Sequence, residues 1–178
     1  GEEQLDRAWV LAQLKPWLEN PQAKKVGQNL KYDIHIFENY QITMQGVAHD
    51  TLLESYVLES HLSHGMDSLA ERHLGIKTIR YEDVCGKGAH QIGFDQVDLK
   101  TATDYAAEDA DVTLRLWKYL KPKLVAEKVK TVYETLERPL PSIIADMENN
   151  GIKVDRAELA RLSALFAQKM EHFEKKKL

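Results

Sequence analysis

Hydrophobic residues spaced three and four positions apart run through most of the chain and predict that helices dominate it. Short polar clusters and turn residues separate these stretches, with Asp50 and Asn29 as expected N-caps and Gly75 as an expected C-cap. Pro16 is expected to disturb the first helix near its end. The predicted helices cover approximately residues 5–18, 30–40, 51–60, 66–74, 101–124, 132–148 and 156–173. A break is expected near residues 98–100, and Asp155 is the expected N-cap of the last helix.

Only two segments, AKKVGQN at 23–29 and GVAHD at 46–50, have the composition of strands. Two short strands do not form a stable sheet by themselves, so we expect an α/β domain whose remaining strands lie upstream of residue 1. The last predicted helix carries an apolar stripe with no obvious partner, which suggests further chain downstream. That stripe consists of Leu159, Leu162, Leu165 and Phe166.

The stretch YAAEDADVTLRL at 105–116 places three acids on one predicted helix. Neighbours on a helix face recur every three or four residues, so these acids fall on different faces. One face is charged and is predicted to be a solvent-exposed ladder of ion pairs: Asp104, Glu108, Asp111, Arg115 and Lys118. The other is aromatic and aliphatic apart from one carboxylate: Tyr105, Asp109, Val112, Leu116 and Leu120.

Asp109 therefore stands out, because an ionised carboxylate on an apolar face needs a cation, a metal or hydrogen-bond donors to offset its burial. Asp33 repeats the pattern on another predicted helix, where it lies near the apolar side and follows Asn29 by four residues. Two such acids would converge on a hard cation such as Mg²⁺ or Mn²⁺. A purely structural hydrogen bond remains the alternative for both.

Two metal ions about 3.5–4 Å apart can activate a water and stabilise the leaving oxygen of a phosphodiester. Tyr105 stands one turn before Asp109, where its hydroxyl could orient that water. Such a site usually needs more carboxylates than two, and no Asp-x-Glu lies on a predicted strand to supply them. The sequence therefore predicts an incomplete two-metal site.

Composition limits the other possibilities. The chain has 178 residues, of which 43% are hydrophobic and 29% charged, as in soluble globular proteins. It has no apolar run of membrane-spanning length and no signal peptide. Its single cysteine, Cys85, excludes an internal disulfide. We therefore expect the protein to be located in the reducing cytoplasm. The net charge of −4 offers no basic footprint for long nucleic acid, so any such partner must be held locally.

His61 and His64 are three residues apart, but no further ligands follow at a spacing typical of zinc sites. We expect both histidines to be exposed to solvent. The short GKG at 86–88 does not have the length of a phosphate-binding loop.

Several motifs together resemble the proofreading 3′-5′ exonuclease of bacterial family A DNA polymerases, the DNA polymerase I family. They are VGQNLKYD at 26–33, DTLLESYVL at 50–58, MDSLAER at 66–72 and YAAEDADVT at 105–113. ENNGIKVD at 148–155 resembles the opening of the polymerase domain that follows. The resemblance covers nearly the whole chain from about residue 8.

The resemblance implies a ribonuclease H-like α/β fold, truncated here at its N-terminus so that helices dominate. It implies an exonuclease part over residues 1–130 and the helical start of a polymerase domain over 131–178. The family's Asn-x-x-x-Asp motif matches Asn29 and Asp33, and its Tyr-x-x-x-Asp motif matches Tyr105 and Asp109. The family's first motif, Asp-x-Glu, has no match and would precede residue 1.

By the same resemblance, Asp33 and Asp109 are catalytic metal ligands for two Mg²⁺ or Mn²⁺ ions, and Tyr105 orients the attacking water. The expected partner is the single-stranded 3′ end of DNA, with no membrane involved and the protein a monomer. Four residues are implied to bind DNA: Gln28, Asn29 and Tyr32 along the path of the terminal nucleotides, and Tyr81 as an aromatic beside the single strand.

Three functions follow as hypotheses. The first is part of a DNA polymerase I that removes mispaired 3′-terminal nucleotides, with little metal binding or hydrolysis by these 178 residues alone. The second is a ribonuclease D-type exoribonuclease, which shares motifs of the same form but not ENNGIKVD. The third is a non-catalytic DNA-binding module in which the acids are structural.

Overall fold

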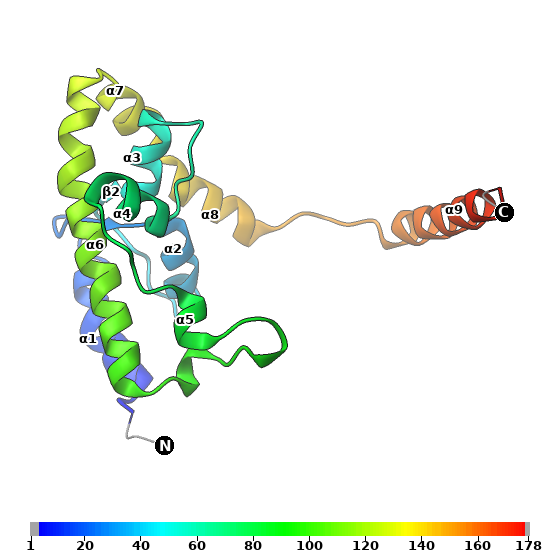
Figure 1. Cartoon of the computed structure of the whole chain (residues 1–178), viewed down its shortest axis with the longest axis horizontal. Helices are drawn as coiled ribbons and strands as arrows, with labels where there is room; N and C mark the ends of the chain where they lie inside the picture. The colour runs from blue at the N-terminus through cyan, green and yellow to red at the C-terminus, as the bar shows by residue number, and fades with distance from the viewer. Residues whose placement is uncertain (1–3, 177–178) are drawn as a thin grey trace. The chain divides into compact units, whose positions relative to one another are not determined.

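The computed structural model describes residues 4–176, and its residues group into two compact units, Gly1–Ala145 and Asp146–Leu178. The first unit contains a parallel pair of strands and most of the helices (Figure 1). Its helices up to the long α6 are α1 Arg7–Leu18, α2 Leu30–Glu38, α3 Thr51–Leu58, α4 Met66–Leu74, α5 Tyr81–Cys85 and α6 Leu99–Ala126.

Both predicted strands are confirmed, as β1 Lys25–Gly27 and β2 Val47–Asp50. They pair in parallel, with Gly27 opposite Asp50. The chain can leave β1 sharply because Gly27 has no Cβ: one placed there would lie 2.3 Å from Cδ2 of Leu30. The result is a helix-rich α/β unit with a small parallel sheet, and the sheet's exit leads directly into α2.

The core lies between α4 and α6, and it confirms the predicted apolar face of the long helix. Val112, Leu116 and Leu120 of α6 pack against Leu69 and Ala70 of α4, each no more than 2% exposed. Fully burying a leucine side chain contributes about 2 kcal/mol, so this seam is a major source of stability. It also fixes the rotation of α6, and with it the directions in which Asp109 and Tyr105 point, one and two turns before Val112.

The predicted helix ends agree with the structure at several caps. The Asp50 carboxylate accepts the N–H of Leu52 at the start of α3, and Gly75 closes α4 with φ 65°. Asp98 caps α6, so the expected break near residues 98–100 is the start of one continuous helix. Pro16 lies inside α1, which continues to Leu18 despite the missing backbone donor.

The single helix predicted over residues 132–148 is wrong. The structure has α7 Lys130–Val132, a π-helical turn Tyr133–Glu137 and α8 Leu140–Asn150. Pro139 and Pro141 lack the backbone N–H that a continuous helix would need, and the wider turn places Tyr133 in the interior with 1% exposure.

The second unit contains α9 Arg156–Lys175, which begins where Asp155 accepts the N–H of Glu158 at 3.0 Å, as predicted. Two members of its apolar stripe, Leu159 and Phe166, are 55% and 58% exposed. None of the helices in the described part of the chain is long and apolar enough to cross a membrane.

Candidate active site

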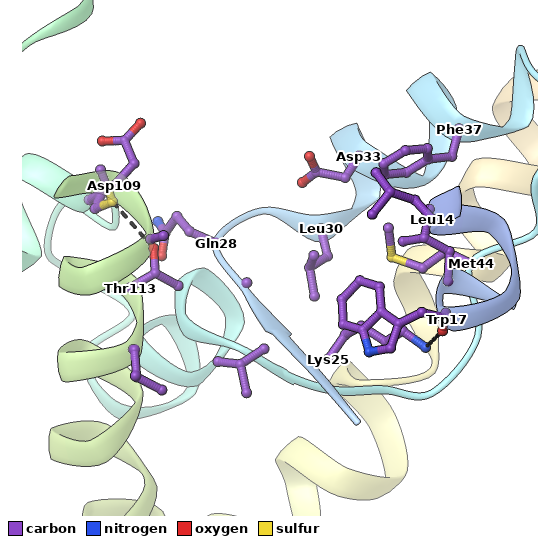
Figure 2. A pocket seen from close by; sticks show the side chains of 16 residues that line it. Leu14, Trp17, Lys25, Gln28, Leu30, Asp33, Phe37, Met44, Asp109 and Thr113 are labelled. Carbon is purple, nitrogen blue, oxygen red and sulfur yellow. Dashed lines mark hydrogen bonds between the residues drawn. The ribbon is translucent and has the colours of Figure 1, made fainter. Parts of the chain in front are cut away.

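Asp33 and Asp109 line one pocket of about 650 Å³. Asp109 extends from α6 on one wall and Asp33 from α2 on the other, with Gln28 at the exit of β1 between them (Figure 2). The rest of the lining is mostly apolar and comes from α1, β1, α2, α4 and α6 and from Met44 before β2. Two acids that are 76 positions apart by number (109 − 33) therefore share a cavity, as the sequence predicts.

The Tyr105 hydroxyl bonds to the Asp109 carboxylate, but one carboxylate oxygen of Asp109 is left without a partner among the described residues. This oxygen, Oδ1, is buried. Burial raises the pKa of Asp109, the Tyr105 hydroxyl acts in the opposite direction, and the charges of Asp67 and Glu108 raise the pKa further. An oxygen left in this condition at a pocket wall is suited to a cation, because a cation would supply the missing interaction.

Asp33 lies in the first turn of α2 and is half-buried. Burial raises the pKa of Asp33, and the negative charge of Asp50 adds to the increase. Both pocket acids therefore hold their charge at a cost that a hard cation would offset. Oxygen-only donors of this kind suit Mg²⁺ or Mn²⁺.

Two carboxylates are fewer than a two-metal site requires. Within residues 4–176, no group of three or more His, Cys, Asp or Glu side chains is arranged to hold a metal. The chain does contain one Asp-x-Glu, at Asp146 and Glu148, but it lies on helix α8 rather than on a strand. The further carboxylates that such a site needs are therefore not found among the described residues, and the incompleteness of the site stays a prediction.

Three aromatic rings form a cluster beside Asp109. Ring centroids are 6.4 Å apart between Tyr81 and Phe94, 6.4 Å between Tyr81 and Tyr105, and 5.8 Å between Phe94 and Tyr105. Tyr81 is 45% and Phe94 38% exposed, so two ring faces are available to a ligand. Burial and the nearby Asp109 carboxylate raise the pKa of Tyr105 to about 12, so its hydroxyl keeps its proton at neutral pH.

Phe94 was missed by the sequence reasoning. It lies in a short 3₁₀ turn, Phe94–Gln96, within the irregular segment that precedes α6. A single aromatic between Gly93 and Asp95 in a polar loop is a signal that could have identified it.

Asn29 is the residue before α2, as predicted, but its side chain makes no capping hydrogen bond. Its backbone is left-handed, with φ 59° and ψ 48°. The first N–H groups of α2 are satisfied by Asp50 instead, which accepts from Asn29 N at 2.9 Å and from Leu30 N at 2.8 Å. The expected capping role of the Asn29 side chain is therefore wrong.

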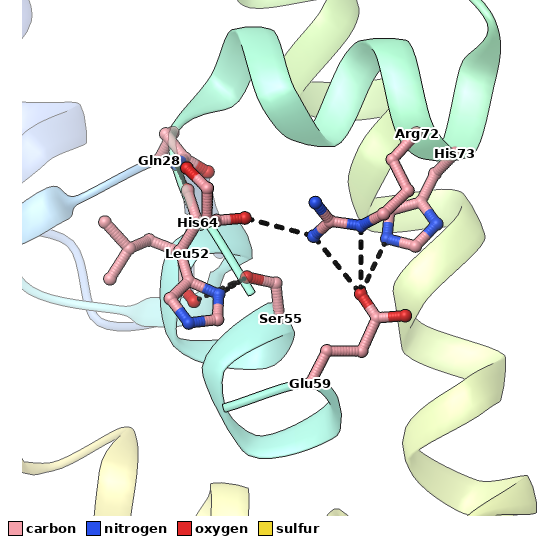
Figure 3. A network of polar contacts seen from close by, with 8 residues as sticks. Gln28, Leu52, Ser55, Glu59, His64, Arg72 and His73 are labelled. Carbon is pink, nitrogen blue, oxygen red and sulfur yellow. Dashed lines mark hydrogen bonds and ion pairs between the residues drawn. The ribbon is translucent and has the colours of Figure 1, made fainter. Parts of the chain in front are cut away.

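The amide of Gln28 is used inside the protein. Its Nε2 donates to the carbonyl of His64 at 2.8 Å (Figure 3). Its Oε1 accepts from the Thr51 hydroxyl. Tyr32, by contrast, is 65% exposed and Asn29 is also exposed. Contact with DNA remains a prediction for Gln28, Asn29, Tyr32 and Tyr81.

His64 is not solvent-exposed, contrary to expectation. Its Nδ1 is 2.7 Å from the Ser55 hydroxyl, whose own donor bond goes to the carbonyl of Leu52, and its Nε2 is buried without a partner (Figure 3). The same figure shows Glu59 between Arg72 and His73, at 3.2 and 3.1 Å. These contacts join α3 to α4 and have no zinc-like arrangement.

The charged face of α6 agrees with the prediction only in part. Asp111 is exposed and pairs with Arg115 at 3.6 Å, as a surface ladder requires. Glu108 differs, because its Oε2 accepts the backbone N–H of Ile79 at 2.6 Å and so anchors the segment before α5.

Comparison with known proteins assigns the chain to a family. A family model described as 3′-5′ exonuclease matches residues 2–125. The chain belongs to this 3′-5′ exonuclease family. Over nearly its whole length it is also similar to a segment of bacterial DNA polymerase I, with 50% identity over 177 residues to that of Pseudomonas aeruginosa and 49% over 169 residues to that of Rhizobium leguminosarum.

These alignments cover 97% and 94% of this chain but 19% and 16% of the relatives, so the chain spans less than a fifth of their length. A solved structure described as the POL domain of Pol1 from M. smegmatis with DNA primer-template and dNTP matches with a TM-score of 0.73. That match covers 95% of this chain and 26% of the M. smegmatis chain, at 23% sequence identity. At this level of identity it shows a similar fold and nothing more. The resemblance to the DNA polymerase I family is confirmed, and the ribonuclease D-type alternative is not favoured.

Proposed function

We propose that this chain is the greater part of a proofreading 3′-5′ exonuclease within a DNA polymerase I, acting on the single-stranded 3′ end of DNA. The observation that carries the proposal is the convergence of Asp33 and Asp109 on one pocket, with an unpartnered carboxylate oxygen on Asp109. Membership of the exonuclease family supports it. In this proposal the pair β1–β2 belongs to a larger ribonuclease H-like sheet, and residues 131–178 begin the polymerase domain.

Asp33 and Asp109 would hold divalent ions, Mg²⁺ or Mn²⁺, together with an Asp-x-Glu pair supplied by the longer polymerase. Bound at this pocket, two such ions would activate a water and neutralise charge on the phosphate. Tyr105, protonated at neutral pH, is suited to orient that water by a hydrogen bond. Hydrolysis of the last phosphodiester releases a nucleoside 5′-monophosphate and leaves a new 3′-hydroxyl on the strand.

The aromatic cluster of Tyr81, Phe94 and Tyr105 supports a single-stranded substrate. An exposed ring face stacks on any base and contributes about 1–3 kcal/mol per base, without dependence on sequence. Tyr32, Asn29 and Gln28 lie near the exit of β1 and are proposed to guide the terminal nucleotides. A proofreader must accept every mispaired terminus, so this tolerance suits the function.

The test is an exonuclease assay on the longer polymerase that carries this segment. Release of mononucleotides from a 3′-labelled single-stranded DNA in Mg²⁺ is the expected result, with a matched single-stranded RNA degraded far more slowly. Preference for RNA would favour a ribonuclease D-type activity. Binding of DNA without release would indicate a non-catalytic binding module.

A further inference from the structure

Asp50 is almost completely buried, at 2% exposure, and lies where β2 passes into α3. Its Oδ1 accepts the N–H of Leu52 at 3.0 Å, which is the ordinary bond of an N-cap. The same oxygen accepts the N–H of Asn29 at 2.9 Å, and Oδ2 accepts the N–H of Leu30 at 2.8 Å. Capping α3 requires only the first bond, so the other two bonds serve a different element.

That element is the turn between β1 and α2. Asn29 adopts a left-handed backbone that is uncommon for a residue with a side chain, and it does not cap the helix itself. The first N–H groups of a helix need acceptors from outside the helix. Asp50 supplies two of these acceptors, so its carboxylate holds the turn in this conformation.

The turn determines where Asp33 lies, because Asp33 is in the first turn of α2, four residues after Asn29. A change in the direction in which α2 leaves β1 would move the Asp33 carboxylate relative to Asp109 across the pocket. Metal chemistry is sensitive to such changes, since a shift of about 1 Å in a reacting group can cost about 100-fold in rate.

Asp50 is itself held from a distant part of the chain. Its backbone N–H donates to the hydroxyl of Tyr133 at 2.9 Å. Tyr133 is 1% exposed, and its ring stacks on His49 with centroids 6.3 Å apart and an interplanar angle of 5°. Tyr133 lies beyond residues 2–125, the part that matches the exonuclease family.

We propose that Asp50 is a positioning residue of the exonuclease site, which fixes the β1–α2 turn through Asn29 and Leu30 and so sets the place of Asp33. This inference rests on the proposed function. Asp50 touches neither metal nor DNA in this account. Its contribution is to hold Asp33 at the correct position relative to Asp109. Tyr133, in the segment after α6, holds Asp50 in turn through its hydroxyl.

The test compares Asp50→Asn with Glu54→Gln. Both substitutions remove a buried carboxylate, and Glu54, at 0% exposure, lies one turn later on α3 but bonds to His49 rather than to the turn. In Asp50→Asn an amide N–H faces a backbone N–H, so at least one bond to the turn is lost. Amide hydrogen exchange of Asn29 and Leu30 in this chain provides a readout that needs neither metal nor activity.

Asp50→Asn is expected to speed exchange at Asn29 or Leu30 by about 10-fold or more, and Glu54→Gln to leave both unchanged. In the longer polymerase, Asp50→Asn is expected to lower kcat by about 10- to 100-fold, with KM for single-stranded DNA unchanged. Glu54→Gln is expected to retain kcat. Unchanged exchange in Asp50→Asn, or an equal loss of kcat in both variants, would overturn the proposal.

If Asp50→Asn does not fold, Tyr133→Phe tests the positioning role of Asp50 instead, because this substitution removes only one hydroxyl group. It is expected to speed exchange at the same two amides by about 5-fold, and unchanged exchange there would overturn the proposal. If the wild-type polymerase releases no nucleotides, the proposed function fails. The exchange measurement would then still show whether Asp50 holds the turn.

Discussion

Asp109 on α6 is partly buried and Glu54 on α3 is fully buried, and each has one buried carboxylate oxygen that lacks a hydrogen-bond partner among the described residues. Burial raises the pKa of each. They differ in their surroundings: Asp109 lines the pocket that it shares with Asp33, whereas Glu54 is not among the residues that line this pocket and bonds to His49 at 2.7 Å. An unpartnered buried oxygen therefore indicates a ligand site only where a cavity gives a ligand access to it.

The largest difference is expected in catalysis. Asp109→Asn in the longer polymerase should lower the rate of nucleotide release by about 10²- to 10³-fold, because a neutral amide binds a divalent ion poorly. Glu54→Gln should leave the rate unchanged. The measurement is release of 3′-terminal label from single-stranded DNA under single-turnover conditions, and equal losses in both variants would remove the distinction between the two acids.

For the free energy of unfolding, we expect the opposite order: the substitution at Glu54 should have the larger effect and the substitution at Asp109 the smaller. Glu54→Ala leaves a cavity and an unpaired His49, so the free energy of unfolding should fall by about 2 kcal/mol. Asp109→Asn should not destabilise the metal-free chain, since it removes a charge that burial disfavours. Urea denaturation of both variants in a chelator tests this contrast, and a larger loss for Asp109→Asn would show that Asp109 has a structural role.

The pH dependence of stability gives a second test of how the burial of Asp109 affects the folded chain. Burial raises the pKa of Asp33 and of Asp109, so above about pH 4 these two carboxyls bind more protons in the folded chain than in the unfolded chain. In the metal-free chain, their contribution to stability should therefore fall as pH rises from about 4 through their folded pKa values. The decrease of stability with pH should be shallower in Asp109→Asn, and thermal unfolding across this pH range measures it. An identical slope in both proteins would contradict the raised pKa of Asp109.

The smallest effect is expected from Asp111→Asn, two positions from Asp109 on the exposed face. Its ion pair with Arg115 spans 3.6 Å at the surface, so the free energy of unfolding should change by less than about 0.5 kcal/mol. Nucleotide release should be unaffected. A strong loss of activity would instead extend the site onto the charged face of α6.

The sequence predicts the site well where helical periodicity applies. The face of Tyr105, Asp109, Val112, Leu116 and Leu120 follows from spacing alone, and the seam with α4 confirms its buried part. The two strands and the caps at Asp50, Gly75 and Asp155 are local features, so short segments of sequence contain the information for them.

What the sequence does not predict depends on contacts between distant segments. The bonds from Asp50 to Asn29 and Leu30 cross 21 and 20 positions, and the bond to Tyr133 crosses 83. The partial burial of His64, whose ring contacts Ser55, and the anchoring of Ile79 by Glu108 also depend on partners in other segments. The π-helical turn at Tyr133–Glu137 interrupts a stretch whose spacing alone resembles one helix.

The central claim is that Asp33 and Asp109 bind the same metal centre. The most direct test is a Mn²⁺ titration of this chain, followed by paramagnetic broadening of its backbone amide signals, which detects even weak binding. The account predicts that signals around Asp33 and around Asp109 broaden together, before those around Glu54, and that either Asp→Asn substitution weakens both effects. Broadening that begins elsewhere, or at only one of the two acids, would contradict it.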